Sequence, residues 1–202
     1  MKIGILASGN GSNFNSIIKK IKSGYLKSEV VLFLTNNQNS KALQTALDNK
    51  IYSAVFSNEM WEDSNPEILK LINSFKPDLI VLAGFLKKIP DSIIKKYKNK
   101  IINIHPSLLP AFGGKGMYGM NIHKKVIEAG VKVSGLTVHF VNEKFDSGRI
   151  IYQKAISVKN DYDYKKLNEV ILKEEHKVLP FIIKKFEENK IKINKDKITI
   201  ED

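Results

Sequence analysis

The chain has 202 residues and no cysteine, so it is long enough to bury a core without disulfides, and it has no thiolate nucleophile. Its net charge is +12, yet Arg149 is its only arginine. Nucleic-acid readers favour arginine at base edges, so we interpret the charge as surface lysine that also attracts small anionic substrates, with no nucleic-acid partner. No apolar run approaches the ~20 residues of a membrane span, and no leader pattern precedes the first strand, so we expect a cytoplasmic protein without a membrane partner.

Strands alternate with helices over the first half of the chain. Short apolar runs predict strands at residues 2–7, 29–35, 51–56, 78–83 and 101–105. Segments with apolar residues on one face predict the helices between them. One of these helices is expected to have Asn65 as its cap and Pro66 at its first position. This alternation predicts a mainly parallel, twisted sheet with helices on both faces.

The second half departs from this alternation. Residues 133–141 and 150–156 are rich in β-formers, and we expect the loop 142–148 to join them as a hairpin. A long helix from about Tyr162 is predicted to be kinked or broken at Pro180, and the polar tail after Ile191 to be frayed. The fold class is therefore α/β, a single-domain, Rossmann-like, doubly wound and mostly parallel sheet with one late antiparallel strand. We expect one domain at residues 1–190 and a polar C-terminal tail at 191–202.

Residues 8–13, Ser-Gly-Asn-Gly-Ser-Asn, lie between the first strand and the first helix. A glycine-rich turn at a helix start is a cradle for an anion, because free N–H groups and the positive end of the helix dipole point at the ligand. A dinucleotide fingerprint would need a third glycine where Phe14 stands, and a P-loop would need Gly-Lys-Ser/Thr. The turn therefore favours one phosphate over a pyrophosphate. The alternative is a tight turn with Ser12 or Asn13 as the helix N-cap.

Asn103 and His105 lie at the end of a predicted strand, in the run Asn-Ile-His-Pro-Ser-Leu-Leu-Pro. Pro106 and Pro110 restrict the backbone there. Ligands of open α/β sheets bind at the carboxyl ends of strands. An amide and an imidazole at that edge can donate hydrogen bonds and a proton to developing negative charge. The alternative is that His105 is a structural loop histidine.

The remaining histidines have less distinctive surroundings. We interpret His123, on an amphipathic helix, as a surface residue. His139 alternates within a strand and either supports a catalytic residue without touching the substrate or is a buried structural residue. His176 beside Glu175 either reaches a binding cleft or forms a helix-face pair. No two histidines or carboxylates have ligand spacing, so no metal is expected. Four glycines in residues 111–119 indicate backbone close to a ligand, a mobile flap or a plain surface loop.

Taken together, these motifs resemble the phosphoribosylglycinamide formyltransferases, folate-dependent enzymes of purine biosynthesis. The resemblance extends from Met1 to about Phe186. It is carried by the segments 8–13, 82–85, 103–110, 138–141, 146–148 and 175–176.

The resemblance implies that the amine of glycinamide ribonucleotide attacks the formyl group of 10-formyltetrahydrofolate. The catalytic residues would be Asn103, His105 and Asp146. Asn103 and protonated His105 would stabilise the oxyanion of the tetrahedral intermediate. Asp146 would keep His105 charged and help to move the proton of the attacking amine, and His139 would support these residues without touching the substrate.

The same matching assigns the binding residues. The ribonucleotide phosphate would lie on Gly11, Ser12 and Asn13, its ribose hydroxyls on Glu175, and the substrate site would include Ile104 and Pro106. The folate would contact Leu86, Lys87 and Ile89 and the loop residues Glu143, Lys144 and Phe145. We expect no metal, and a monomer or weak homodimer. Two positions depart from the family, since Lys87 stands where an arginine is often found and Arg149 where proline is usual.

Three alternatives stay open. A formyltetrahydrofolate hydrolase has a similar Asn/His/Asp set but typically an extra N-terminal regulatory domain. A methionyl-tRNA formyltransferase shares Ser-Leu-Leu-Pro but needs a C-terminal tRNA-binding domain, for which we expect no room here. A non-catalytic nucleotide-binding module would explain the phosphate turn but not Asn103, His105 and Asp146 together.

Overall fold

The computed structural model describes residues 1–195 and 197–201, and it divides into two compact units, Met1–Asn103 and Ile104–Asp202. The boundary falls inside β5 (Ile101–His105). Each unit has its own helices and strands, and each is described in turn.

A parallel sheet forms the centre of the first unit. Its strands pair in the order β3-β2-β1-β4-β5. Their bounds are β1 (Lys2–Leu6), β2 (Glu29–Thr35), β3 (Ser53–Val55), β4 (Leu79–Leu82) and β5 (Ile101–His105). Strands covered on both faces are continuous apolar runs, and β4, Leu-Ile-Val-Leu, is buried at all four positions. These strands lie where the sequence predicts them.

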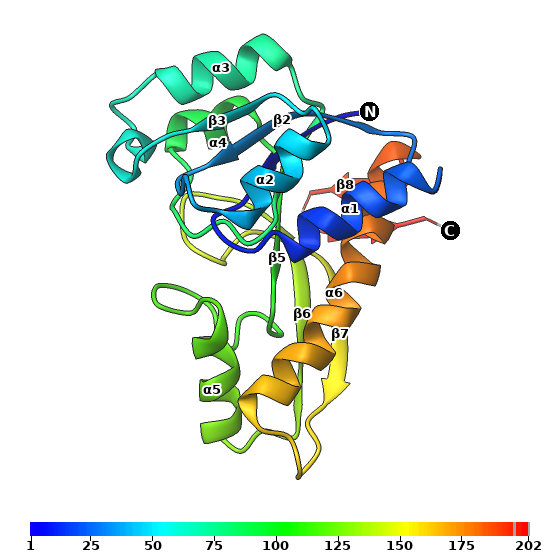
Figure 1. The fold of residues 1–202 in the computed structure, drawn as a ribbon. Helices are drawn as coiled ribbons and strands as arrows, with labels where there is room; N and C mark the ends of the chain where they lie inside the picture. The colour runs from blue at the N-terminus through cyan, green and yellow to red at the C-terminus, as the bar shows by residue number, and fades with distance from the viewer. Residues whose placement is uncertain (196, 202) are drawn as a thin grey trace. The chain divides into compact units, whose positions relative to one another are not determined.

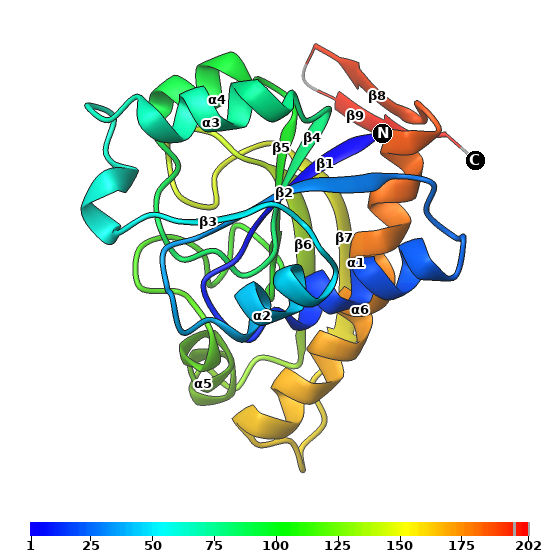
Figure 2. The ribbon, with the colours of Figure 1, turned by 45° about the horizontal axis from the view of Figure 1, so that its top comes forward.

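Helices cover both faces of this sheet (Figures 1 and 2). α1 (Ser12–Lys22) and α2 (Lys41–Asp48) lie on one face, and α3 (Glu67–Phe75) and α4 (Asp91–Lys96) on the other. A 3₁₀ turn, η1 (Asn58–Trp61), precedes α3. The N-cap of α3 is Pro66, one residue later than predicted, although the side-chain oxygen of Asn65 accepts a hydrogen bond from the Glu67 N–H at 2.9 Å.

The second unit contains an antiparallel pair, β6 (Val133–Phe140) and β7 (Ile150–Ser157). α5 (Met120–Glu128) packs against α6 (Tyr164–Glu187), which also contacts β6 (Figure 1). The predicted break at Pro180 is wrong, because α6 is one helix of 24 residues with Pro180 inside it. Pro180 is buried among Val178, Leu179 and Ile182. Burying such side chains stabilises by about 1.5–3 kcal/mol each, which offsets the ~3 kcal/mol that a proline costs inside a helix.

A small antiparallel sheet follows α6, with strands β8 (Ile191–Asn194) and β9 (Lys197–Ile200). The expectation of a frayed tail is therefore wrong over these strands. Isoleucine alternates with polar residues in both, and this period of two marks half-buried strands. Arg149 Nη1 donates to the Lys195 carbonyl oxygen at 2.8 Å, which ties the hairpin to the start of β7.

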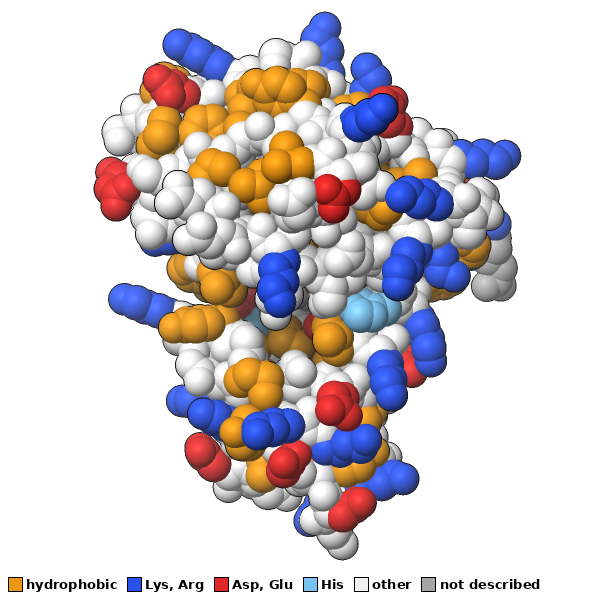
Figure 3. All heavy atoms as spheres, in the orientation of Figure 1, with side chains coloured by type: hydrophobic (Ala, Val, Ile, Leu, Met, Phe, Trp, Pro, Cys, Tyr) orange, Lys and Arg blue, Asp and Glu red, His pale blue; other side chains and the backbone are white. Residues whose placement is uncertain are grey.

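The fold class is the predicted one, a mostly parallel sheet with alternating helices and an antiparallel end. Lysine and arginine side chains are scattered over the face shown in Figure 3 and do not gather in one patch. Within residues 1–195 and 197–201, no helix combines the length and apolarity needed to cross a bilayer.

Candidate active site

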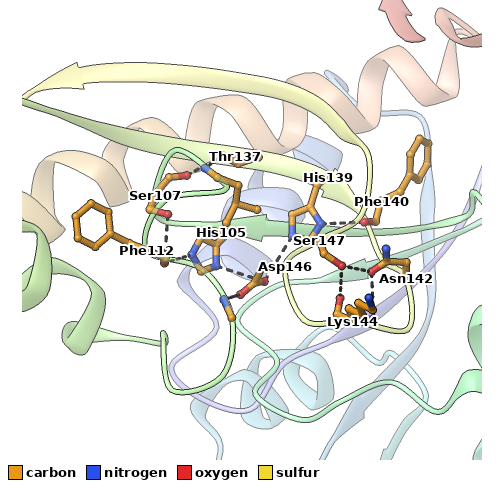
Figure 4. A network of polar contacts seen from close by, with 12 residues as sticks. His105, Ser107, Phe112, Thr137, His139, Phe140, Asn142, Lys144, Asp146 and Ser147 are labelled. Atoms are coloured by element: carbon orange, nitrogen blue, oxygen red, sulfur yellow. Dashed lines mark hydrogen bonds and ion pairs between the residues drawn. The ribbon is translucent and has the colours of Figure 1, made fainter. Parts of the chain in front are cut away.

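His105, at the end of β5, has both ring nitrogens next to oxygen atoms (Figure 4). Nε2 lies 2.9 Å from the Phe112 carbonyl oxygen, and Nδ1 lies 3.5 Å from Asp146 Oδ1. The side chain is buried, with 4% of the residue exposed. A carbonyl and a carboxylate both accept hydrogen bonds, so each nitrogen of the His105 ring faces an acceptor.

Asp146 is the carboxylate that the structure places beside His105. Its Oδ2 accepts a hydrogen bond from the Gly114 N–H at 2.9 Å, and its Oδ1 faces both His105 and, at 3.7 Å, His139 Nε2. The Asp146 backbone is left-handed, with φ of 52°, a conformation that aspartate and asparagine adopt more readily than other non-glycine residues. The turn after Asp146 also needs Gly148, because a Cβ there would lie 1.7 Å from the Phe140 carbonyl oxygen.

His139 lies on β6, buried next to Asp146. Its Nδ1 donates to the Phe140 carbonyl oxygen at 2.8 Å, which fixes the tautomer of the neutral ring. Burial lowers the pKa of His139, although the Phe140 hydrogen bond and the charge of Asp146 both raise it. His139 is therefore neutral at neutral pH.

His123 is also buried, on α5, with 1% of its surface exposed. Its assignment to the surface is wrong, because α5 packs this face against α6 together with Ile122 and Val126. Burial lowers the pKa of His123 to about 4, a hydrogen bond with Asn168 raises it, and the positive charge of His105 lowers it further. Periodicity alone did not reveal this, since a histidine beside an apolar stripe fits either face of a helix.

Asn103 and His105 are two residues apart in β5, so their side chains leave the strand on the same face. Ile104, between them, points to the other face and is buried. Pro106 is half-buried at the strand end. The strand therefore presents an amide and an imidazole in the same direction, as the sequence analysis expects.

The glycine-rich turn lies in the first unit, where Gly11 is the N-cap of α1 with φ of 70°. No side chain caps α1, so the interpretation of Ser12 or Asn13 as the N-cap is wrong. Ser40 Oγ donates to the Gly9 carbonyl oxygen at 2.8 Å and braces the turn. The first N–H groups of α1 are thus presented without a competing cap, which suits an anion.

The residues assigned to the folate lie on two loops. In the first unit, Ile89 is buried, Lys87 is half-buried and Leu86 is 52% exposed. The Leu86 N–H donates to Ser8 Oγ at 3.0 Å, so any ligand contact at Leu86 uses its carbonyl or side chain. In the second unit, Glu143, Lys144 and Phe145 are exposed on the loop that carries Asp146, and Glu175 is buried on α6.

Several contacts of the site come from positions that the sequence did not single out. The Phe112 carbonyl and the Gly114 N–H belong to the backbone, which leaves no signal in residue type. Thr137 gives a weak signal in the sequence, because Thr137 and His139 are polar residues on the same face of a strand that is otherwise buried. Among the described residues, no group of three His, Asp or Glu side chains could hold a metal ion.

The sequence of the chain matches a known family over most of its length. The family model described as formyl transferase matches residues 1–183. The chain belongs to this family.

The names of similar proteins agree with the family that the motifs resemble. Phosphoribosylglycinamide formyltransferase of Bacillus subtilis is 37% identical over 186 residues, covering 91% of this chain and 93% of the relative. The chloroplastic phosphoribosylglycinamide formyltransferase of Arabidopsis thaliana is 37% identical over 203 residues, covering 98% of this chain and 70% of the relative. Among solved structures, glycinamide ribonucleotide transformylase 1 from Symbiobacterium toebii superposes with a TM-score of 0.90 at 29% identity, covering 100% of this chain and 94% of that one.

One of the similar solved structures has a different activity in its name. The formyltetrahydrofolate deformylase from Pseudomonas syringae superposes with a TM-score of 0.86, but at 22% identity this likeness concerns the fold alone. The superposition covers 100% of this chain and 66% of the deformylase. About a third of the deformylase therefore has no counterpart in this chain.

Proposed function

We propose that Asn103, His105 and Asp146 carry out the reaction of this chain, which transfers a formyl group to the amine of glycinamide ribonucleotide in purine biosynthesis. The activity follows from relatives and solved structures that share nearly the whole chain. The observation that supports the residue roles is the position of His105 between the Phe112 carbonyl and the Asp146 carboxylate. A charged imidazole in a buried site is what a developing oxyanion needs.

In the proposed mechanism, the amine nitrogen of the ribonucleotide attacks the formyl carbon of 10-formyltetrahydrofolate, and the carbonyl electrons move to oxygen. Asn103 donates an amide N–H to this oxyanion, and the positive charge of His105 stabilises it. Asp146 keeps His105 protonated and helps to move the amine proton toward the folate nitrogen. The bond between that nitrogen and the formyl carbon then breaks, which releases tetrahydrofolate and the formylated ribonucleotide.

The binding residues form a second part of the proposal. The phosphate binds the N–H groups of Gly11, Ser12 and Asn13 at the start of α1, which no side chain caps. Glu175 binds the ribose hydroxyls, and Ile104 and Pro106 line the substrate site. The folate contacts are assigned to Leu86, Lys87, Ile89, Glu143, Lys144 and Phe145, with His139 behind Asp146.

The setting of the enzyme is also proposed. One formyltransferase domain spans residues 1–190, and the protein acts in the cytoplasm as a monomer or weak homodimer without metal, nucleic acid or membrane. The plant relatives bear the word chloroplastic in their names, which applies to those proteins.

A formyl-transfer assay tests this function. Purified protein is given 10-formyltetrahydrofolate with and without glycinamide ribonucleotide, and tetrahydrofolate, formate and formylated product are measured. We expect product only with the ribonucleotide, and a loss of at least ~10²-fold in the single-turnover rate with His105→Ala, since one oxyanion-stabilising group contributes about that much.

The assay also separates the alternatives. Formate release without the ribonucleotide would identify a hydrolase, and formylation of methionyl-tRNA would identify the tRNA enzyme. Binding of the ribonucleotide with no turnover would identify a nucleotide-binding module. Any of these results in place of ribonucleotide-dependent transfer contradicts the proposal.

A further inference from the structure

Two polar side chains that face each other across the β6–β7 pair bind the loop that follows His105. Thr137 and Gln153 are cross-strand partners in the register of this antiparallel pair. Gln153 Nε2 donates to Thr137 Oγ1 at 3.0 Å and to the Leu109 carbonyl oxygen at 2.9 Å. The Thr137 and Gln153 side chains with these contacts are called here the Thr137–Gln153 clamp.

Thr137 Oγ1 uses its full hydrogen-bonding capacity in the clamp. It donates to the Ser107 carbonyl oxygen at 2.7 Å and accepts from the Leu109 N–H at 3.0 Å as well as from Gln153. A hydroxyl has one proton to donate and two lone pairs, so every position is occupied. Thr137 and Ser107 are both 0% exposed, so no water competes for these bonds. The clamp therefore holds three backbone groups of the loop, at Ser107 and Leu109.

From Ser107 the hydrogen bonds continue toward His105. Ser107 Oγ donates to the Ala111 carbonyl oxygen at 2.7 Å. It also lies 3.4 Å from the next carbonyl oxygen, that of Phe112, which accepts from His105 Nε2 at 2.9 Å (Figure 4). Phe112 has φ of 53°, a left-handed conformation that a bulky side chain rarely adopts. Such backbone strain persists only where the surroundings enforce it. The bonds that begin at the clamp enforce it here.

We infer that the Thr137–Gln153 clamp is a positioning device for His105. It holds the Phe112 carbonyl against Nε2 and thereby fixes the orientation of the ring, with Nε2 as a hydrogen-bond donor. Thr137 and Gln153 act through the loop, because the hydrogen bonds of the clamp go to Ser107 and Leu109 and not to the His105 ring. The inference rests on the proposed catalytic role of His105 for its effect on rate, but not for its effect on the ring.

The test compares four variants with the parent enzyme. Thr137→Val keeps the shape of the side chain and removes all three hydrogen bonds, and Thr137→Ser restores the hydroxyl. Gln153→Ala removes the side chain that donates to Thr137 and Leu109. Gln153 is exposed, so this substitution should not impair folding. Ser134→Ala is the matched control, because Ser134 is a buried hydroxyl on the same strand with no hydrogen-bond partner among the described residues.

The first readout is the ¹⁵N spectrum of the His105 ring at neutral pH. In the parent, Thr137→Ser and Ser134→Ala, we expect Nε2 at the shift of a nitrogen that carries a proton and donates it to a carbonyl. In Thr137→Val, the loss of the Phe112 acceptor should move the Nε2 signal away from that shift. Signals unchanged in a folded Thr137→Val protein overturn the inference.

The second readout is the single-turnover rate of formyl transfer together with KM for each substrate. Thr137→Val should lower the rate about 10²-fold with KM changed less than about threefold, since a misplacement of roughly 1 Å has that effect on a catalytic group. Thr137→Ser should recover most of the rate, and Gln153→Ala should lower it about tenfold. A fifth protein that combines Thr137→Val with Gln153→Ala should be no slower than Thr137→Val alone, because both substitutions act through the same loop.

The two readouts fail in different ways. A Thr137→Val enzyme with a lower melting temperature but a parental rate and parental His105 signals would show a merely structural threonine and overturn the clamp. If His105→Ala keeps the parental rate, the proposed role of His105 falls, and the ring spectra still decide whether the clamp positions it.

Discussion

Asp146 is the residue at which most polar contacts of the site meet. It faces two histidines and accepts the Gly114 N–H, while its backbone is left-handed. The carboxylate places a negative charge beside His105, and the proposed mechanism depends on that charge. An amide of the same shape would keep the hydrogen bond from Gly114 but lose that charge.

Asp146→Asn should therefore lower the single-turnover rate by about 10²–10³-fold, the effect of losing oxyanion stabilisation. Folding should be retained, because asparagine also tolerates the left-handed backbone. Ribonucleotide affinity should change little, since the phosphate contacts are assigned to α1. A stable variant with a near-parental single-turnover rate would remove Asp146 from the mechanism.

His123 gives a prediction for stability against pH. Its pKa is lowered to about 4 from an ordinary value of 6.5, so the unfolded chain binds a proton more readily than the folded one. Stability is fully present above about pH 6.5 and falls as the pH drops toward 4, by roughly 3 kcal/mol in total from this group.

Urea unfolding between pH 7.5 and 4.5 measures this loss. His123→Gln removes the titrating group while keeping a polar side chain near Asn168. Its free energy of unfolding should depend clearly less on pH over this range than that of the parent. Equal pH dependence in the two proteins would show that His123 is not the source of the acid sensitivity.

For single residues, the sequence predicted the side chains of the site but not the backbone groups and the packing around them. Asn103 and His105 were singled out by their position at a strand end and Asp146 through a resemblance, and the structure brings His105 and Asp146 together. The Phe112 carbonyl that completes the environment of His105 was out of reach, because any residue carries a carbonyl. His123 was misplaced because its burial depends on the tertiary packing of α5 on α6.

The turn between β6 and β7 is sterically restricted at Gly148. A Cβ at Gly148 would lie 1.7 Å from the Phe140 oxygen and 2.7 Å from its carbon. Both atoms belong to the backbone of β6, which cannot move away as a side chain can. The turn therefore leaves no room for a side chain at Gly148.

Gly148→Ala should lower the free energy of unfolding by about 1–3 kcal/mol, the usual cost of overpacking, and should displace Asp146 with the turn. Gly9→Ala is the control, because nothing lies within 4 Å of a Cβ at Gly9. Urea unfolding of both variants provides the measurement. Equal stability of the two would mean that the turn adjusts freely.

The strands and most helices were predictable because each has a clear apolar pattern. A continuous apolar run identifies β4, and β-forming residues identify both strands of the β6–β7 pair. The β8–β9 sheet has the same alternation, but lysines and a position near the chain end outweighed it. The break assigned to Pro180 failed because local propensity is weaker than the burial around it.

Over the whole molecule, the excess of lysine predicts an effect of salt on substrate capture. The net charge is +12, and the proposed ribonucleotide and folate substrates are both anions. Charges on the surface are screened beyond about 8 Å at physiological ionic strength. Attraction of anions should therefore weaken as salt is added.

KM for glycinamide ribonucleotide should rise several-fold between about 20 and 300 mM sodium chloride, with the single-turnover rate at saturation unchanged. The riboside without its phosphate is the matched control and should show a much weaker dependence. Initial rates at each salt concentration provide the values. A ribonucleotide KM independent of salt would assign no steering role to the lysines.

The contact between Gly11 and Ala42 has a consequence for laboratory evolution of this enzyme. A Cβ at Gly11 would lie 2.6 Å from the Ala42 Cβ and 2.9 Å from its Cα, so substitutions at position 11 displace α2 as well as the turn. A fall in substrate affinity after Gly11→Val would therefore not report on phosphate binding alone. In a library randomised at both positions, surviving clones should retain glycine at 11 together with a small residue at 42, and the two sites would be inherited as one unit of selection.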